Sequence, residues 1–180
     1  MRKVINIQGK EFKTSILSVH IKRAIERLSF EINQDYIDKD IMFISILNGS
    51  FMFASDLVRK INGFCQISFV KLSSYHSIES TGTVRELIGL NEDISNKHVI
   101  LLEDIIDSGL TIDTITSQLK SKNPASLKIA TLLFKPQAYQ KNLKIDYIGI
   151  EMPNGFLVGY GLDFNGFGRN LEDIYTLNEE

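Results

Sequence analysis

Residues 99–112 of the chain read VILLEDIIDSGLTI. An apolar run leads into two adjacent acids, then into a short loop with a third acid, a serine and a glycine, and finally into a helix-like pattern. A short apolar run that is rich in β-branched residues is typical of a buried strand. A buried strand that passes through a glycine-containing loop into a helix is typical of a parallel α/β sheet. This stretch therefore indicates both the fold class and the place where chemistry is to be sought.

The same alternation of strands and helices continues on both sides of this stretch. Strands are expected at residues 41–47, 65–72, 98–102, 127–134 and 147–150. Helices are expected at residues 17–32, 50–61, with Ser50 as the capping residue, and 111–119. The predicted fold is α/β, with a mainly parallel twisted sheet flanked by helices on both faces. Ligands of such sheets bind beyond the carboxyl ends of the strands, which include residues 47–50, 103–111 and 135–136.

The loop from Asp107 to Thr111 has the features of a phosphate-binding site. Backbone N–H groups at the start of a helix point outward, and the helix dipole there favours an anion. Gly109 permits close approach of the backbone, while Ser108 and Thr111 add hydroxyl donors. The segment has neither the GxxxxGK[ST] spacing of a P-loop nor the GxGxxG of a dinucleotide fold. A purely structural alternative, in which Asp107 and Ser108 only cap the helix, competes with this interpretation.

Composition limits the classes of function. The chain has 180 residues, 20 basic and 22 acidic side chains and a net charge of -2. This balance provides no broad basic field for nucleic acid or an anionic membrane. No apolar run approaches the roughly 20 residues of a membrane span, and the N-terminus does not read as a signal peptide. We expect one cytoplasmic domain over residues 1–180 that binds neither nucleic acid nor a membrane.

The segment from Glu103 to Thr111 resembles the phosphoribosyl-diphosphate signature of type I phosphoribosyltransferases. Its Glu-Asp opening is similar to that of the hypoxanthine-guanine branch. Four further segments match the family in the same order along the chain: a pyrophosphate loop, a mobile loop, a strand-end lysine and a C-terminal hood, at 47–50, 73–82, 135 and 156–169. The resemblance implies the type I phosphoribosyltransferase fold. It also implies a core at about 36–150 and a small hood built from about 1–15 and 151–180.

The reaction implied by the resemblance belongs to purine salvage. The 5-phosphoribosyl group moves from phosphoribosyl diphosphate to N9 of hypoxanthine or guanine, giving IMP or GMP and pyrophosphate. The sugar passes through an oxocarbenium-like state, which nearby carboxylates stabilise. Asp107 is the implied general base near the purine N7. Mg²⁺ is the implied cofactor, and Glu103, Asp104 and Asp163 are its implied contacts.

The remaining site residues follow from the same resemblance. The residues implied to bind phosphoribosyl diphosphate are Glu103, Asp104, Ser108, Gly109, Leu110, Thr111, Asn48, Gly49, Ser74, Tyr75 and Arg169. Those implied to bind the purine are Lys135, Phe156, Leu157 and Asp163. Lys135 would donate to the 6-oxo group, which adenine lacks. The family often has a lysine where this chain has Asn48, and it often holds the peptide bond before that position cis. Asn48 leaves Arg169 and Mg²⁺ to neutralise the pyrophosphate.

Two alternatives stay open at the level of the sequence. A regulatory protein of this fold would bind RNA or DNA, although the charge balance and the intact acids favour catalysis. A sister enzyme would act on adenine, orotate or chiefly xanthine. Lys135 and the Glu103-Asp104 pair argue against adenine and orotate, whereas selection at the purine C2 depends on backbone geometry near Leu157 and Asp163. Xanthine therefore remains possible.

The resemblance also implies that the enzyme is a homodimer or a homotetramer acting on small molecules. The apolar run Phe51-Met52-Phe53 follows the pyrophosphate loop directly. These side chains would serve either a subunit interface or the core.

Overall fold

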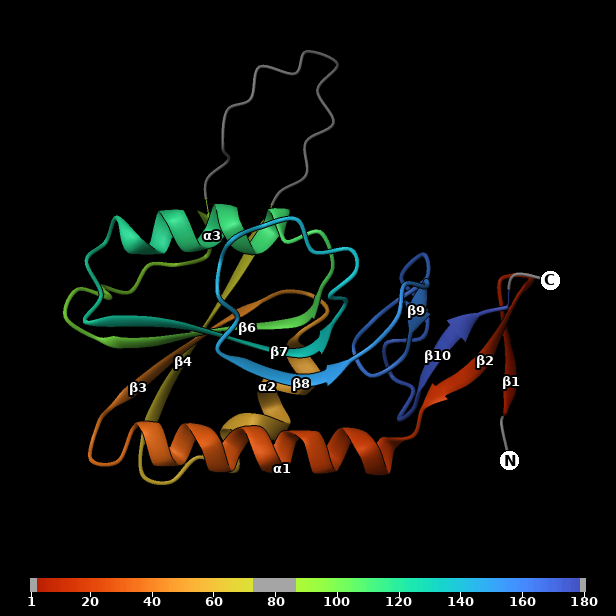
Figure 1. The fold of residues 1–180 in the computed structure, drawn as a ribbon, viewed down its shortest axis with the longest axis horizontal. Helices are drawn as coiled ribbons and strands as arrows, with labels where there is room; N and C mark the ends of the chain where they lie inside the picture. The colour runs from red at the N-terminus through yellow and green to blue at the C-terminus, as the bar shows by residue number, and fades with distance from the viewer. Residues whose placement is uncertain (1–2, 73–86, 179–180) are drawn as a thin grey trace, which may run out of the picture.

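The computed structural model describes residues 3–72 and 87–178, in which a six-stranded sheet lies between helices (Figure 1). The strand order is β5-β4-β3-β6-β7-β8. The strands are β3 (Ile41–Ile46), β4 (Cys65–Leu72), β5 (Leu87–Ile88), β6 (His98–Ile106), β7 (Ser126–Phe134) and β8 (Tyr147–Glu151). β5 pairs antiparallel with β4, and every other pairing in this sheet is parallel. The predicted α/β fold with a mainly parallel sheet is confirmed.

Both faces of the sheet are covered by helices. Helices α1 (Ser18–Asp35) and α2 (Phe51–Val58) lie on one face, and α3 (Leu110–Lys120) lies on the other (Figure 1). In β3 every residue is buried. The consecutive side chains Phe43 and Ile44 belong to different apolar clusters, one on each face of the sheet. A strand buried on both faces reads as a continuous apolar run, which is why the sequence pattern located it. None of the helices in the described part of the chain is long and apolar enough to span a bilayer.

Helix α2 begins where predicted, after Ser50, but it ends earlier and lacks the predicted capping hydrogen bond. It stops at Val58, several residues before the expected end at residue 61. Ser50 occupies the N-cap position, but its side chain makes no capping hydrogen bond. Its hydroxyl is turned inward instead, donating to the carbonyl of Ile46 and lying 2.7 Å from the Ser45 hydroxyl. The predicted capping role was wrong because the buried end of β3 offers this hydroxyl nearer partners.

Strand β6 is longer than predicted. It continues through Ile106 because residues 103, 105 and 106 still pair with β7, for example Glu103 with Thr131 and Ile106 with Phe134. Glu103 and Asp104 therefore lie within the strand and not after its end. Their carboxylates are held by a paired backbone, which fixes their direction more firmly than a loop would.

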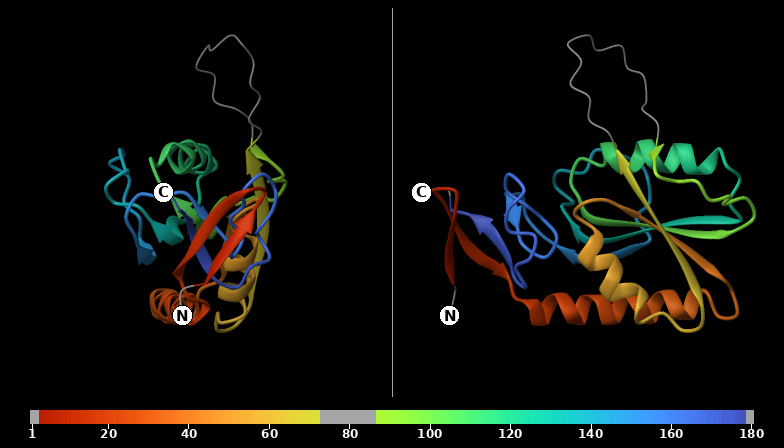
Figure 2. Two further views of the ribbon diagram at one scale, coloured as in Figure 1. Left: turned by 90° about the vertical axis from the view of Figure 1, so that its right-hand side faces the viewer. Right: turned by 180° about the vertical axis from the view of Figure 1, so that it is seen from behind.

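A second, four-stranded sheet joins the two ends of the chain (Figure 2). Its order is β1-β2-β10-β9 and its pairings are antiparallel, with β1 at Val4–Ile7, β2 at Lys10–Ile16, β9 at Leu157–Val158 and β10 at Ile174–Leu177. Figure 2 shows this sheet beyond one end of the main sheet. It uses residues from both segments assigned to the hood. The division at about residues 15 and 151 stays a proposal.

Candidate active site

The loop between β6 and α3 forms the floor of the candidate site. A small hollow of about 90 Å³ is lined there by Glu103, Ile105, Ile106, Asp107, Ser108, Gly109, Leu110, Thr111 and Ile112. Gly109 is the N-cap residue of α3 and has a φ of 84°, which favours glycine. A Cβ at this position would collide with the ring of Tyr139, so the loop also needs a glycine for space. The N-cap residue Gly109 has no side chain to cap α3, and the Leu110 N–H makes only a long hydrogen bond, 3.5 Å, to the Ser108 hydroxyl. The positive end of the helix dipole is thus left facing the hollow, where an anion is favoured.

Asp107 and Lys135 meet across the carboxyl ends of β6 and β7. The Lys135 ammonium lies 2.8 Å from Oδ2 of Asp107. Lys135 is buried, with 7% of its surface exposed, and its backbone N–H donates to the carbonyl of Ile106. Asp107 therefore forms an ion pair with a lysine and does not cap α3, so the capping alternative is wrong for Asp107. Ser108 does accept a long hydrogen bond, 3.5 Å, from the Leu110 N–H. The lysine and the aspartate present a hydrogen-bond donor and an acceptor side by side at the end of the sheet.

Glu103 and Asp104 are buried carboxyl groups. Burial, followed by the charge of Asp104, raises the pKa of Glu103 well above its ordinary value. Burial raises the pKa of Asp104 from 3.8 to about 6, although hydrogen bonds from the backbone of residues 104 and 105 oppose the shift. Oε2 of Glu103 is buried and accepts no hydrogen bond from the described residues. Oε2 of Glu103 therefore lacks the donor or cation that a buried carboxylate usually has, whereas Asp104 has backbone donors and the nearby charge of Arg169, which only partly offset its burial.

These carboxyl groups fit a cation that is bound mainly through substrate oxygens. No cluster of three or more histidine, cysteine, aspartate or glutamate side chains among the described residues forms a complete metal cage. Mg²⁺ commonly uses only one or two carboxylates, together with waters and substrate phosphates. The unpartnered oxygen of Glu103 and the adjacent Asp104 are a donor set of this kind.

The loop after β3 packs directly onto Asp104. The peptide bond between Leu47 and Asn48 is cis, as the resemblance implied. A Cβ on Gly49 would collide with the Asp104 carboxylate, so only glycine fits at this position. The structure therefore brings the predicted pyrophosphate loop against one of the predicted metal contacts.

Arg169 and Asp163, both in the C-terminal segment assigned to the hood, form an ion pair. Nη2 of Arg169 lies 2.5 Å from Oδ1 of Asp163, and Nη1 donates to the carbonyl of Gly161 at 2.7 Å. Oδ2 of Asp163 also accepts a hydrogen bond from the backbone of Gly166. Two residues that the resemblance assigned to pyrophosphate and to metal thus form one ion pair.

The predicted purine contacts in the hood differ in their exposure. Leu157 is buried, whereas 45% of the Phe156 surface is exposed. The Phe156 ring also packs edge-on against Phe164 at 5.8 Å and near Phe12 at 6.4 Å. One side of an aromatic cluster is therefore open to solvent. Stacking on a base stays a prediction, and the predicted Ser74 and Tyr75 contacts lie outside the described residues.

Sequence reasoning missed two tyrosines that brace these loops. The Tyr139 ring packs on Gly109, and the Tyr160 hydroxyl donates to Asp56 of α2 at 2.5 Å. Tyr139 stands in a polar segment without periodicity, so it gave no signal. Tyr160 stands between two glycines, which is the one local sign that its backbone is unusual.

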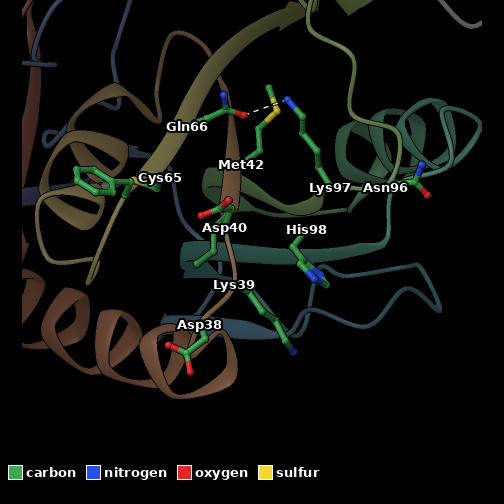
Figure 3. Close-up of a pocket in the computed structure, with 11 residues that line it drawn as sticks. Asp38, Lys39, Asp40, Met42, Cys65, Gln66, Asn96, Lys97 and His98 are labelled. Atoms are coloured by element: carbon green, nitrogen blue, oxygen red, sulfur yellow. Dashed lines mark hydrogen bonds between the residues drawn. The ribbon is translucent and has the colours of Figure 1, made fainter.

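A separate pocket of about 660 Å³ lies at the opposite edge of the main sheet (Figure 3). It is lined by residues near the starts of β3, β4 and β6, including Asp40, Gln66 and His98. Its charged side chains are of both signs, and Lys97 is hydrogen-bonded to Gln66 at 3.0 Å. The pocket is far from the carboxyl ends of the strands and gathers no matching set of donors and acids, so the smaller hollow at Asp107 is the better candidate.

Comparison with known proteins agrees with this geometry. The model of the phosphoribosyl transferase domain matches residues 14–165. Hypoxanthine-guanine phosphoribosyltransferase of Aquifex aeolicus is 37% identical over 175 residues, covering 96% of this chain and 98% of the relative. The enzyme of the same name from Staphylococcus epidermidis is 40% identical over 173 residues, covering 95% and 97%.

Solved structures give the same result. A hypoxanthine-guanine phosphoribosyltransferase from Bacillus anthracis superposes with a TM-score of 0.83 and 32% identity, covering 99% of this chain and 100% of the other. The hypoxanthine phosphoribosyltransferase of Trypanosoma cruzi gives a TM-score of 0.82 and 30% identity, with 93% and 97% covered. The likeness extends over sequence, topology and nearly the full length of each protein. The chain belongs to the phosphoribosyl transferase family, and the relatives named above are hypoxanthine-guanine and hypoxanthine phosphoribosyltransferases.

Proposed function

We propose that this protein transfers the 5-phosphoribosyl group from phosphoribosyl diphosphate to N9 of hypoxanthine or guanine in purine salvage. The products are IMP or GMP and pyrophosphate. The observation that carries the proposal is the 2.8 Å contact between Lys135 and Asp107 beside the start of α3. A 6-oxopurine presents an acceptor, O6, and the neighbouring N7 on one edge of its ring. The lysine and the carboxylate match these two atoms.

The proposed chemistry follows from that match. Lys135 donates to O6 and orients the base, which excludes adenine because its 6-amino group does not accept in the same way. As N9 bonds to the anomeric carbon, the bond from that carbon to pyrophosphate breaks and positive charge develops on the purine. Asp107 then accepts the N7 proton. The half-exposed ring of Phe156 and the backbone at Leu157 would bound the other side of the base.

The remaining groups are proposed to hold phosphoribosyl diphosphate. The N-terminus of α3, with Ser108, Gly109, Leu110 and Thr111, would bind the 5-phosphate. Glu103 and Asp104 would accept hydrogen bonds from the ribose hydroxyls. Mg²⁺, when bound, would neutralise charge on the leaving pyrophosphate, and Glu103, Asp104 and Asp163 would hold it or its waters. Asn48, Gly49 and Arg169 would bind the pyrophosphate, with Ser74 and Tyr75 included on sequence grounds alone.

We also propose that the chain is a homodimer or homotetramer. Phe53 is fully buried and belongs to the core, but Phe51 at the start of α2 is exposed. Phe64 just before β4 is 95% exposed, and Ile67 and Phe69 of β4 are also exposed. Large apolar side chains left in water commonly mark a protein interface.

Sedimentation equilibrium should give a mass of two or four chains, and a monomer at micromolar concentration would contradict the proposal.

The direct test of the proposed function is pyrophosphate release from phosphoribosyl diphosphate in the presence of Mg²⁺. Hypoxanthine, guanine, xanthine and adenine are assayed in parallel. We expect turnover with hypoxanthine and guanine and none with adenine, while the xanthine rate decides the question that the sequence left open. Silence with all four bases, in a folded sample, would favour the regulatory alternative, which binding of RNA or DNA at low salt would then establish.

Replacement of the proposed general base should separate catalysis from folding. Asp107→Asn keeps the shape of the side chain but accepts no proton, so kcat should fall by about 10²–10⁴-fold. The matched control is Asp113→Asn, because Asp113 also forms an ion pair with a lysine, Lys141, at 2.9 Å. The control should retain turnover within about twofold. Near-normal turnover in Asp107→Asn would remove Asp107 from this role.

The buried Asp104 carboxylate should lower the free energy of unfolding of the metal-free protein, although the proposed activity requires it. Its folded pKa of about 6 lies above its ordinary value of 3.8. The unfolded chain therefore ionises first, and the free energy of unfolding falls as the pH rises from about 4 to 6. Asp104→Asn removes this cost, so at pH 7.5 it should raise the free energy of unfolding by ~1–3 kcal/mol, and activity should fall.

Urea unfolding at pH 4 and at pH 7.5 checks this expectation. The gain should be present at pH 7.5 and nearly absent at pH 4, because at the lower pH the aspartate is largely protonated in the folded state. A gain of equal size at both values, or none at pH 7.5, would contradict the assigned cause.

A further inference from the structure

Tyr160 connects the C-terminal segment to helix α2 through a hydrogen bond of its hydroxyl group. The tyrosine is 6% exposed, and its hydroxyl donates to Oδ2 of Asp56 at 2.5 Å across 104 positions of sequence. Burial and then this hydrogen bond raise the pKa of Tyr160 above its ordinary value, so the hydroxyl stays protonated and remains a donor. Asp56 belongs to α2, which begins immediately after the loop at residues 47–50.

The residue after Tyr160 lies against that loop. Gly161 has a φ of 98°, and a Cβ there would collide with the carbonyl oxygen of Gly49. Gly161 also exchanges two hydrogen bonds with Arg169: its N–H donates to the Arg169 carbonyl at 2.9 Å, and its carbonyl accepts from the Arg169 guanidinium at 2.7 Å. Gly161 is thus a backbone spacer between the loop and the arginine.

The contacts continue to the carboxylate on the other side of the loop. A Cβ on Gly49 would collide with Asp104, just as a Cβ on Gly161 would collide with Gly49. Asp104, Gly49, Gly161 and Arg169 therefore follow one another in direct contact. Since the contact between Gly161 and Gly49 joins two backbones, the separation between the 47–50 loop and Arg169 depends on where the backbone at residue 161 is held.

Tyr160 is the side chain that holds this backbone. The N–H of Tyr160 donates to the Leu171 carbonyl at 2.8 Å, but this bond stays within the C-terminal segment between β9 and β10. Apolar packing places Tyr160 in the same cluster as Phe53 and Leu57 of α2, and the hydroxyl's bond to Asp56 adds a directional attachment to α2 and so to the loop that precedes it. Loss of the hydroxyl would leave this packing and the C-terminal segment intact but would remove the directional bond that fixes the segment's position relative to Gly49.

We propose that Tyr160 is a positioning residue for the pyrophosphate group: by bonding to Asp56 it keeps Gly161 on Gly49 and holds Arg169 at a fixed distance from the 47–50 loop. The inference rests on the proposed function, in which Gly49 and Arg169 bind pyrophosphate. Asn48 makes this spacing more important, because the loop carries no lysine whose long side chain would adapt to a displaced phosphate.

Tyr160→Phe tests the inference because it removes the hydroxyl alone. The KM for phosphoribosyl diphosphate, and the Kd for pyrophosphate with Mg²⁺ measured by calorimetry, should rise on the order of tenfold, as expected for a hydrogen bond to a charged group. The KM for hypoxanthine should change less than about twofold. Asp56→Asn keeps an acceptor and the size of the side chain, so it should show a smaller rise in the same direction. The Asp56→Asn variant tests the same hydrogen bond if Tyr160→Phe does not fold.

Tyr147→Phe is the matched control. Tyr147 is also buried, and its hydroxyl donates to Oδ2 of Asp35 at 2.6 Å, but it belongs to β8 and bonds to the end of α1. It should lose thermal stability without a change in pyrophosphate affinity. An equal loss of affinity in both variants would show general loosening and overturn the positioning role.

The outcomes separate the inference from the function on which it rests. Wild-type turnover together with unchanged pyrophosphate affinity in Tyr160→Phe and Asp56→Asn would overturn the inference alone. A wild-type protein that neither turns over nor binds pyrophosphate would overturn the proposed function, and the inference with it. A selective loss of pyrophosphate affinity in Tyr160→Phe supports the inference.

Discussion

The parallel, in-register pairing of β3, β6 and β7 is the constraint on which the site depends. Ile44 pairs with Leu101, and Leu101 pairs with Ile129, so the three strands run side by side in one direction. Their carboxyl ends consequently emerge at one edge of the sheet. This common edge is what brings together the loop with Asn48, the acid Asp107 and the lysine Lys135, which are widely separated in sequence. A register slip in any of these strands would separate the groups.

The buried carboxyl groups of the candidate site lower the stability of the free protein. Glu103 and Asp104 are buried within a paired strand, and burial raises the pKa of both. A buried carboxylate without donors or a cation is unfavourable in the free protein. Substrate hydroxyls and a substrate-bound Mg²⁺ would supply these partners. Burial that disfavours the ionised form of these two acids in the free protein would therefore favour a ligand that supplies a cation or hydroxyl groups.

Glycines set the dimensions of the site. Gly49, Gly109 and Gly161 each lie where a Cβ would overlap a neighbouring carboxylate, ring or carbonyl. Only the contact of Gly161 with Gly49 joins two backbones, whereas Gly49 and Gly109 lie against the side chains of Asp104 and Tyr139, so the loops are positioned by the residues packed behind them. The tyrosines at 139 and 160 are such supports, one behind the start of α3 and the other between the hood and α2.

The sequence by itself determined the features that depend on local pattern. Apolar runs located β3, β4, β6, β7 and β8, helical spacing located α1 and α3, and the motif around Asp107 identified the family, because each of these signals lies within a short window. Tertiary structure alone decided the inward turn of Ser50, the extension of β6 through Ile106, the pairing of Asp107 with Lys135 and the bond from Tyr160 to Asp56. These contacts join segments brought together only when the chain has folded, so burial and competition between distant partners decide them and no local pattern encodes them.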